Sequence, residues 1–340
     1  MNVISLHPQA WSRLRGQRER LPHALLLVGQ RGLGKLALAE TFAASLLCEQ
    51  GTADDRPCGR CLACNWLRQG SHPDYRLLQP DALGAEEEGE DGKKEKASQQ
   101  ITIDQVRALD DFLIVGTHRA GLRIVIIHPA EAMNRNTANA LLKTLEEPSA
   151  GTLFLLVSNE PLRLLPTIRS RCQVIPVGLP SSADAEAALA AEGIVEPRRW
   201  LALAGGSPGL AIELAGMAQG GWLELLATRL AASQAIDPLG LAGELDKLVR
   251  ESKGRVPLKA IVEAMQKWLV DLSLAGNGLP VRYFLPQQAA IRKLADMIPP
   301  MKLARAYRGL LDHRRACEQP LNARLFLEGL FIEYRSLLSH

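Results

Sequence analysis

Short apolar runs alternate with amphipathic stretches over the first half of the chain. Each run ends in glycine or polar residues and has the length of a buried strand, at 24–28, 75–79, 123–127, 152–158 and 172–177. Between the runs, residues 36–47 and 136–148 repeat their apolar positions at helical spacing. Strands that alternate with helices predict a parallel α/β sheet with both faces covered.

Two helix starts carry capping signals. Thr102 and Gln105 have the spacing of a capping box at the head of a helical stripe. For the helix that stops before Pro148, Asn136 is the expected cap. Both signals place a helix directly before a predicted strand.

The strand pattern fades after residue 178, and only amphipathic helices follow. We therefore expect an α/β domain over 1–178, a small helical lid over 179–220 and a helical collar over 221–340. The first domain carries a cysteine-rich insertion at 48–64. Residues 81–99 are charged and nearly free of large apolar groups, so we expect them to form a flexible surface loop.

Composition narrows the class of protein. The chain has 340 residues, enough for two or three domains, with 47% hydrophobic and 23% charged residues. A net charge of +3 carries no strong signal for nucleic-acid binding by charge alone. The first twenty residues are too polar for a targeting signal, and no apolar run is long enough for a membrane span. We expect a cytoplasmic protein without membrane contact.

Four of the six cysteines lie close together in the insertion. Cys48, Cys58, Cys61 and Cys64 have the spacing C-x9-C-x2-C-x2-C. Because cytosolic thiols stay reduced, the pattern favours metal ligation over disulfides. Four thiolates complete a tetrahedral Zn2+ site and leave no open position, so we expect structural zinc. An iron–sulfur cluster is the alternative metal, but the expected Cys-Pro does not follow Cys64.

The stretch GQRGLGKLAL, residues 29–38, resembles a phosphate-binding loop. Gly29, Gly34 and Lys35 match its pattern, and backbone amides around Gly32 could cradle phosphates. Leu36 stands where such loops carry the Ser or Thr that ligates Mg2+. These residues form a candidate ATP site that lacks one ligand, and whether nucleotide still binds there stays open.

Several segments together resemble the bacterial DNA polymerase III clamp-loader subunits, AAA+ proteins related to replication factor C. The resemblance is carried by HALLLVGQRGLGK, the cysteine insertion, ANALLKTLEEP and LLPTIRSRC, and it covers residues 20 to about 215. It implies a P-loop-type AAA+ domain, a lid and an oligomerising collar. It also implies a hetero-pentamer with motor (gamma/tau) and delta subunits, which places a sliding clamp on primer-template DNA during replication.

The chain departs from the motor members of that family at the ATPase site. Motors carry Asp-Glu after the third strand, where this chain has His128 and Pro129. The lid arginine of motors is replaced by Gly209, and Glu131 is not expected to substitute for the lost acids. Together with Leu36, these departures affect metal binding, water activation and charge stabilisation. The chain resembles the non-hydrolysing delta prime (stator) type, and we expect no hydrolysis by the chain alone.

One functional element of the family is intact. Arg171 lies in the tripeptide Ser-Arg-Cys, which the resemblance identifies as an arginine finger acting on the ATP of a neighbouring subunit. An arginine supplied in this way stabilises charge on the transferring phosphoryl group and needs no nucleotide in its own subunit. A surface salt bridge is the alternative interpretation of Arg171.

Two other functions remain open. The chain could be an ATP-binding or ATP-hydrolysing motor subunit of the same loader, because Lys35 and the loop glycines are present. It could also be a zinc-containing nucleic-acid-binding protein, although its low charge and 4% aromatic content argue against this.

Overall fold

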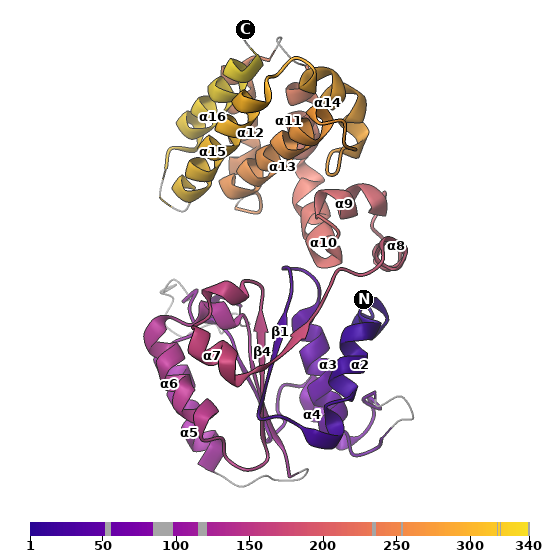
Figure 1. The fold of residues 1–340 in the computed structure, drawn as a ribbon, viewed down its shortest axis with the longest axis vertical. Helices are drawn as coiled ribbons and strands as arrows, with labels where there is room; N and C mark the ends of the chain where they lie inside the picture. The colour runs from indigo at the N-terminus through magenta and orange to yellow at the C-terminus, as the bar shows by residue number, and fades with distance from the viewer. Residues whose placement is uncertain are drawn as a thin grey trace. The chain divides into compact units, whose positions relative to one another are not determined.

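The computed structural model describes residues 1–51, 56–83, 98–114, 121–232, 236–252, 254–317, 319 and 321–338. Most of the surface loop expected over 81–99 lies outside these residues, as do four positions of the cysteine insertion. The chain divides into two compact units, residues 2–181 and residues 182–340, drawn in Figure 1. Each unit is described separately below.

The first unit is built on a parallel sheet of five strands in the order β2-β3-β4-β1-β5. The strands are β1 (Ala24–Val28), β2 (Tyr75–Leu78), β3 (Arg123–Ile127), β4 (Thr152–Ser158) and β5 (Gln173–Pro176). They coincide with the five apolar runs to within a residue or two, so the parallel α/β prediction is confirmed. In the register of the central strands, Leu26 of β1 lies opposite Leu156 of β4 and Val174 of β5.

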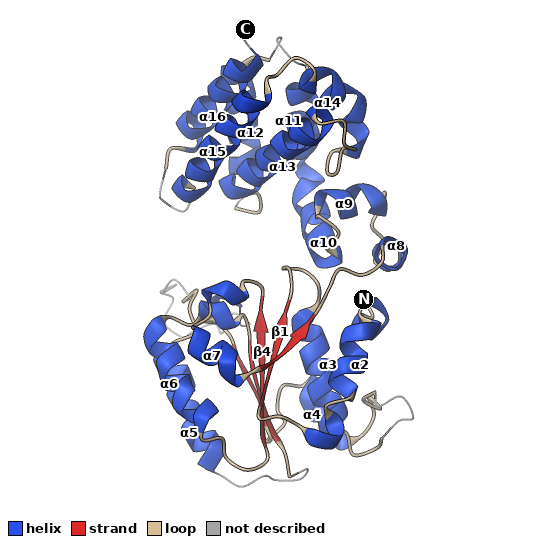
Figure 2. Ribbon diagram, in the orientation of Figure 1, coloured by secondary structure: helices blue, strands red, loops and turns tan. Residues whose placement is uncertain are grey.

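Helices cover both faces of this sheet, as Figure 2 shows. One face packs on α1 (Val3–Leu6), α2 (Pro8–Arg15) and α3 (Lys35–Leu47), and the other on α5 (Ile103–Ile114), α6 (Arg135–Glu146) and α7 (Pro166–Arg171). Alternate strand residues point to opposite faces, so Leu25 and Leu27 enter one core and Leu26 enters the other. The short α4 (Leu62–Arg68) and the 3-10 turns η1 (Arg18–Arg20), η2 (Asp81–Leu83), η3 (Ala130–Ala132) and η4 (Pro161–Arg163) complete the unit.

The two capping predictions have different outcomes. The Thr102 amide donates to Gln105 Oε1 (2.8 Å) and the Gln105 amide donates to Thr102 Oγ1 (3.3 Å), which confirms the capping box. The prediction of Asn136 as the cap of α6 is wrong. Asn134 is extended and its Oδ1 accepts from the Thr137 amide (3.0 Å), so α6 begins two positions earlier and Asn136 lies in its first turn.

The described part of the second unit is helical throughout. Its helices are α8 (Ser182–Ala191), α9 (Pro197–Leu203), α10 (Pro208–Met217), α11 (Trp222–Ala231), α12 (Pro238–Glu251), α13 (Leu258–Gly276), α14 (Gln288–Ala295), α15 (Pro300–Ala316) and α16 (Ala323–Leu338), with 3-10 turns η5 (Ala218–Gly220) and η7 (Leu285–Gln287). None of the helices in the described ranges has the length and apolar character needed to cross a bilayer.

Buried aromatic residues fill the core of this unit. Trp268 Nε1 donates to the Tyr334 hydroxyl (2.9 Å), which in turn donates to the Leu230 carbonyl (3.1 Å). These bonds satisfy the polar atoms of two large buried side chains and join three helices. The core extends from Ala185 to Leu338. A lid–collar boundary near residue 220 stays a prediction.

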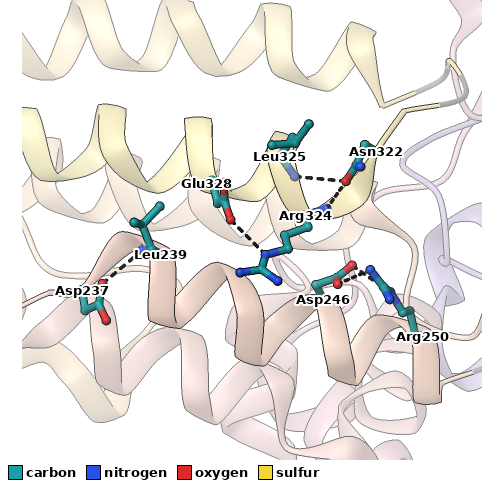
Figure 3. Close-up of polar contacts among 8 residues, drawn as sticks. All are labelled: Asp237, Leu239, Asp246, Arg250, Asn322, Arg324, Leu325 and Glu328. Carbon is teal, nitrogen blue, oxygen red and sulfur yellow. Dashed lines mark hydrogen bonds and ion pairs between the residues drawn. The ribbon is translucent and has the colours of Figure 1, made fainter.

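Side-chain caps define where α12 and α16 begin (Figure 3). Asp237 Oδ1 accepts from the Leu239 amide (3.2 Å), and Asn322 Oδ1 accepts from the Arg324 amide (3.1 Å). Each helix also carries an ion pair between residues four apart, Asp246–Arg250 (2.6 Å) and Arg324–Glu328 (3.0 Å). Caps of this kind contribute about 1 kcal/mol each.

Candidate functional site

The phosphate-type loop lies at the edge of the sheet where the parallel strands end. Gly29 follows β1, His128 follows β3 and Asn159 follows β4, and these three strands are neighbours in the sheet. The carboxyl ends of parallel strands are where α/β proteins bind ligands. Residues from three separate parts of the sequence therefore meet at one candidate site.

The glycines of the loop have a structural explanation. Gly32 (φ 78°) and Gly34 (φ 73°) are in the left-handed region that only glycine adopts readily. A Cβ added to Gly29 would overlap the carbonyl oxygen of Val177, just after β5. The loop geometry thus requires glycine at all three positions whether or not a phosphate is bound.

The Lys35 side chain is turned back onto its own loop. Its Nζ donates to the carbonyls of Gly29 (2.9 Å) and Gln30 (2.6 Å) and to Asn159 Oδ1 (2.8 Å). An ammonium group has three N–H donors, so all three are bound to protein acceptors. The residue is only 3% exposed. A phosphate could engage this lysine only by displacing at least one of these bonds.

The Glu131 carboxylate attracts the Lys35 ammonium group electrostatically. Burial lowers the pKa of Lys35 to about 8, and attraction to Glu131 opposes that change. Glu131 Oε1 also accepts from the Asn159 backbone amide (2.9 Å), so Glu131 is bonded to the residue whose side chain accepts from Lys35. Hydrogen bonds therefore run from Lys35 through Asn159 to Glu131 Oε1, while Glu131 Oε2 is buried without a partner in the described part of the chain. Such a network stabilises the loop in the absence of ligand.

The lowered pKa of Lys35 yields a pH prediction. The unfolded lysine titrates near its ordinary 10.5 and the folded one at about 8, so between these values the unfolded chain binds more protons. The free energy of unfolding therefore rises with pH across that window, by up to about 3 kcal/mol for this group. We expect Lys35→Met to remove that rise in urea unfolding measured across the window. The exposed Lys247→Met should retain it, and equal pH profiles in all three proteins would contradict the assignment.

The positions expected to hold Mg2+ in a working site are apolar or neutral. His128 takes the place of an acid after β3, and burial lowers its pKa and so favours the uncharged ring. The following Pro129 is joined by a cis peptide bond and carries no ligand atom in its side chain. Leu36, the second residue of α3, has no hydroxyl group. These three positions provide no anionic or hydroxyl ligand for a metal.

Arg171 ends α7, on the sheet face opposite α3. Its Nη2 pairs with Glu146 Oε1 (2.6 Å) and its Nη1 donates to the Thr167 carbonyl (2.9 Å). The Arg171 side chain is 34% exposed and that of Glu146 is 48% exposed. A guanidinium has five N–H donors, so this arrangement leaves some available to an external acceptor. The structure therefore holds Arg171 at the surface, apart from the loop of its own chain.

The four clustered cysteines lie where α3 ends and α4 begins. Their sulfur atoms all lie within 4.8 Å of one another. The Cys48–Cys61 and Cys58–Cys64 separations are both 3.9 Å. Tetrahedral zinc with Zn–S bonds of about 2.3 Å requires sulfur atoms about 3.8 Å apart, so the cluster can hold a metal ion.

Backbone amides favour the thiolate form within this cluster. The Cys61 amide donates to Cys58 Sγ (3.3 Å), and the Cys64 amide donates to Cys61 Sγ (3.4 Å). Hydrogen bonds from the Arg60 and Cys61 amides lower the pKa of Cys58 to about 6. Burial has the opposite effect on Cys64, whose pKa it raises to about 12. Because the thiolate is the form that binds metal, the backbone amides prepare Cys58 for an ion, while Cys64 must lose its proton when the ion binds.

Sequence reasoning missed three contributors to these sites. Asn159 was recognisable as a polar residue directly after a buried strand. Glu146 belongs to a recognised segment, but its pairing with Arg171 depends on tertiary structure. The buried His7 Nε2 lies 2.6 Å from the Leu33 carbonyl in the loop, and no local signal marks that contact.

Comparisons with known proteins agree on one group. A family model described as "DNA polymerase III, delta subunit" matches residues 7–179. The chain is 37% identical to DNA polymerase III subunit delta' of Pseudomonas aeruginosa, over 96% of this chain and 95% of the relative. It is 36% identical to subunit delta' of Escherichia coli, over 58% of this chain and 56% of the relative.

A solved structure supports the fold. The DNA polymerase III gamma subunit-related protein of Thermotoga maritima aligns over 97% of this chain and 100% of its own, with a TM-score of 0.50 and 19% identity. At that identity the likeness concerns the fold alone.

Proposed function

Because the chain belongs to the DNA polymerase III delta subunit family, we propose how it performs the delta prime role in the clamp loader. It acts as a stator that does not hydrolyse ATP in its own site and supplies Arg171 to the ATP of an adjacent motor (gamma/tau) subunit. Its other neighbour is the delta subunit, and the assembly places a sliding clamp on primed DNA. The delta' relatives aligned over most of the chain support this assignment.

The observation that carries the stator proposal is the internal engagement of Lys35. All three ammonium hydrogens are bound to acceptors of the same chain, with Glu131 as the balancing charge. A motor would need this group for phosphate and would need metal ligands beside it. The replacements at Leu36 and His128 remove such ligands. The site is thus stable when empty and poorly equipped for hydrolysis.

The intact Arg171 supports the second half of the proposal. Its charge is exposed at the end of a helix, and its partner Glu146 is half-exposed. Ion pairs of this exposure contribute about 1 kcal/mol or less, so a neighbouring phosphate can readily outcompete the carboxylate. Glu146 therefore orients the Arg171 guanidinium, and the ion pair is weak enough for a phosphate to replace it.

The cysteine cluster holds structural zinc in this proposal. The sulfur separations and the thiolate-favouring amides fit the ion, and four thiolates leave no site for a reacting water. The role of the ion is to join Cys48, at the end of α3, to Cys58, Cys61 and Cys64 at and before the start of α4.

Isolated protein distinguishes a stator from a motor. We expect no ATP turnover by the purified chain, because Leu36 and His128 replace the residues that ligate Mg2+ in a motor and Pro129 replaces the acid that polarises water. The measurement is phosphate release over hours, with a motor subunit of the same loader as positive control. Turnover that matches the motor and disappears in Lys35→Ala would show that this chain is itself a motor.

A further inference from the structure

A cavity in the second unit has no role in the sites described so far. It is about 190 Å3 in volume and lies between α13 and α15, beside the segment that precedes η7. Figure 1 shows α13 and α15 lying next to each other in this unit. The polar side chains that line the cavity are Glu263, Gln266, Lys267, Tyr283, Tyr307 and Arg314.

One buried hydrogen-bond donor of the lining has no acceptor. Gln266 is only 7% exposed, and its Nε2 has no partner in the described part of the chain. The other donors of the lining are less buried, since Lys267 and Tyr283 are half-buried and Tyr307 is 39% exposed. A buried donor without an acceptor costs about 1–3 kcal/mol. A ligand with acceptor atoms would recover that free energy.

The charge of the lining indicates the class of ligand. Arg314 Nη2 lies 3.6 Å from Glu263 Oε1, so these two charges oppose each other. Lys267 adds a second positive charge, which leaves the lining at +1. Burial lowers the pKa of Lys267, with Glu263 opposing, which indicates an ammonium group removed from water. One unmatched positive charge suits an anion of charge −1.

We propose that this cavity binds a carboxylate group, with Lys267 as its ion-pair partner and Gln266 and Tyr307 as hydrogen-bond donors. The volume is well above the roughly 30 Å3 that one water occupies, so the carboxylate and a few attached carbons fit. Val270 and the tyrosine rings provide apolar contact for those carbons. The carboxylate belongs to a small organic acid or to an acidic side chain of a bound protein. The proposal is independent of the stator function.

The test is a titration of the full chain with sodium acetate against sodium chloride at constant ionic strength. The readout is the methyl NMR signal of Val270, which lines the cavity in every variant. We expect a saturable shift with acetate but not with chloride or neutral acetamide. Lys267→Met should abolish it, and Gln266→Leu should weaken acetate binding about tenfold, the loss of one hydrogen bond to a charged group.

A matched control is available on α12. Lys247 is 75% exposed and pairs with Glu251 at 3.9 Å, so Lys247→Met removes the same charge from the same unit without touching the cavity. Its acetate response should equal that of the unchanged protein. An absent response in the unchanged protein, or an equal loss in Lys247→Met, overturns the proposal.

The assembled loader identifies the source of the carboxylate. If the acetate response persists in the reconstituted complex, the cavity takes a small acid from solution. If assembly abolishes the response and Lys267→Met weakens the complex, an acidic side chain of a neighbour occupies the cavity. A third outcome is that assembly abolishes the acetate response while Lys267→Met leaves the stability of the complex unchanged. That result would count against an ion pair between Lys267 and a carboxylate of a neighbour.

Discussion

Arg171→Ala is expected to reduce ATP hydrolysis by the reconstituted clamp loader while leaving this subunit folded and assembled. A trans-acting arginine contributes about 10^3-fold or more in rate at the site that it serves. Only the motor site next to this subunit should lose that contribution. Single-turnover kinetics should therefore show one nucleotide per complex that is hydrolysed slowly, with the other sites active.

The structure explains why folding should survive this change. Arg171 is 34% exposed, and among the described residues it pairs with the half-exposed Glu146, so little stability is lost with it. Arg163→Ala is a matched control, because Arg163 lies just before α7, is 65% exposed and pairs with Glu160 at 3.6 Å. Arg171→Lys keeps the charge but loses the planar fork and should restore only part of the rate. Unchanged single-turnover kinetics in Arg171→Ala would remove the finger assignment.

Removal of the metal is expected to have the largest effect on stability. Cys61→Ser should abolish stoichiometric zinc and lower the free energy of unfolding of the first unit by more than about 3 kcal/mol, because metal binding is folding free energy for such insertions. Cys61 Sγ also accepts from the Cys64 amide at the head of α4, so its loss affects the helix as well. The measurements are metal content by mass spectrometry and thermal unfolding.

A control and two contrary outcomes complete this test. Cys317 lies at the carboxyl end of α15, outside the cysteine cluster, so the Cys317→Ala variant should retain one zinc per chain. Iron in the purified protein would favour the iron–sulfur alternative. A Cys61→Ser variant that keeps one zinc and its full stability would show that the cluster is not the metal site.

Much of the first unit was accessible from hydrophobic pattern alone. Buried parallel strands require nearly continuous apolar runs, so the runs at 24–28 and 152–158 could be recognised without any contact information. The start of α6 was not accessible in the same way. Asn134 and Asn136 are both good caps, and the choice depends on how the chain leaves β3 through η3.

In the candidate sites too, some features can be recognised from the sequence and others depend on the tertiary structure. Metal-ligand spacing and the missing acids are properties of residue type and order, so the sequence indicates both the cysteine cluster and the degenerate phosphate loop. The bond from Lys35 to Asn159 spans 124 positions and exists only because β1 and β4 are adjacent in the sheet. Local patterns carry no information about such a contact.

By itself, the sequence determined the strand and helix pattern, the four clustered thiols and the residue types at Leu36 and His128, because these follow from side-chain chemistry and short spacings. Only the tertiary structure decided that Lys35 is satisfied within its own chain, that Glu146 pairs with Arg171 and that Gln266 Nε2, near Lys267, is buried without an acceptor in the described part of the chain. Each of these depends on distances between residues far apart in sequence. Such distances are set when whole helices and strands pack together to bury apolar surface, and the local sequence around each residue does not specify them.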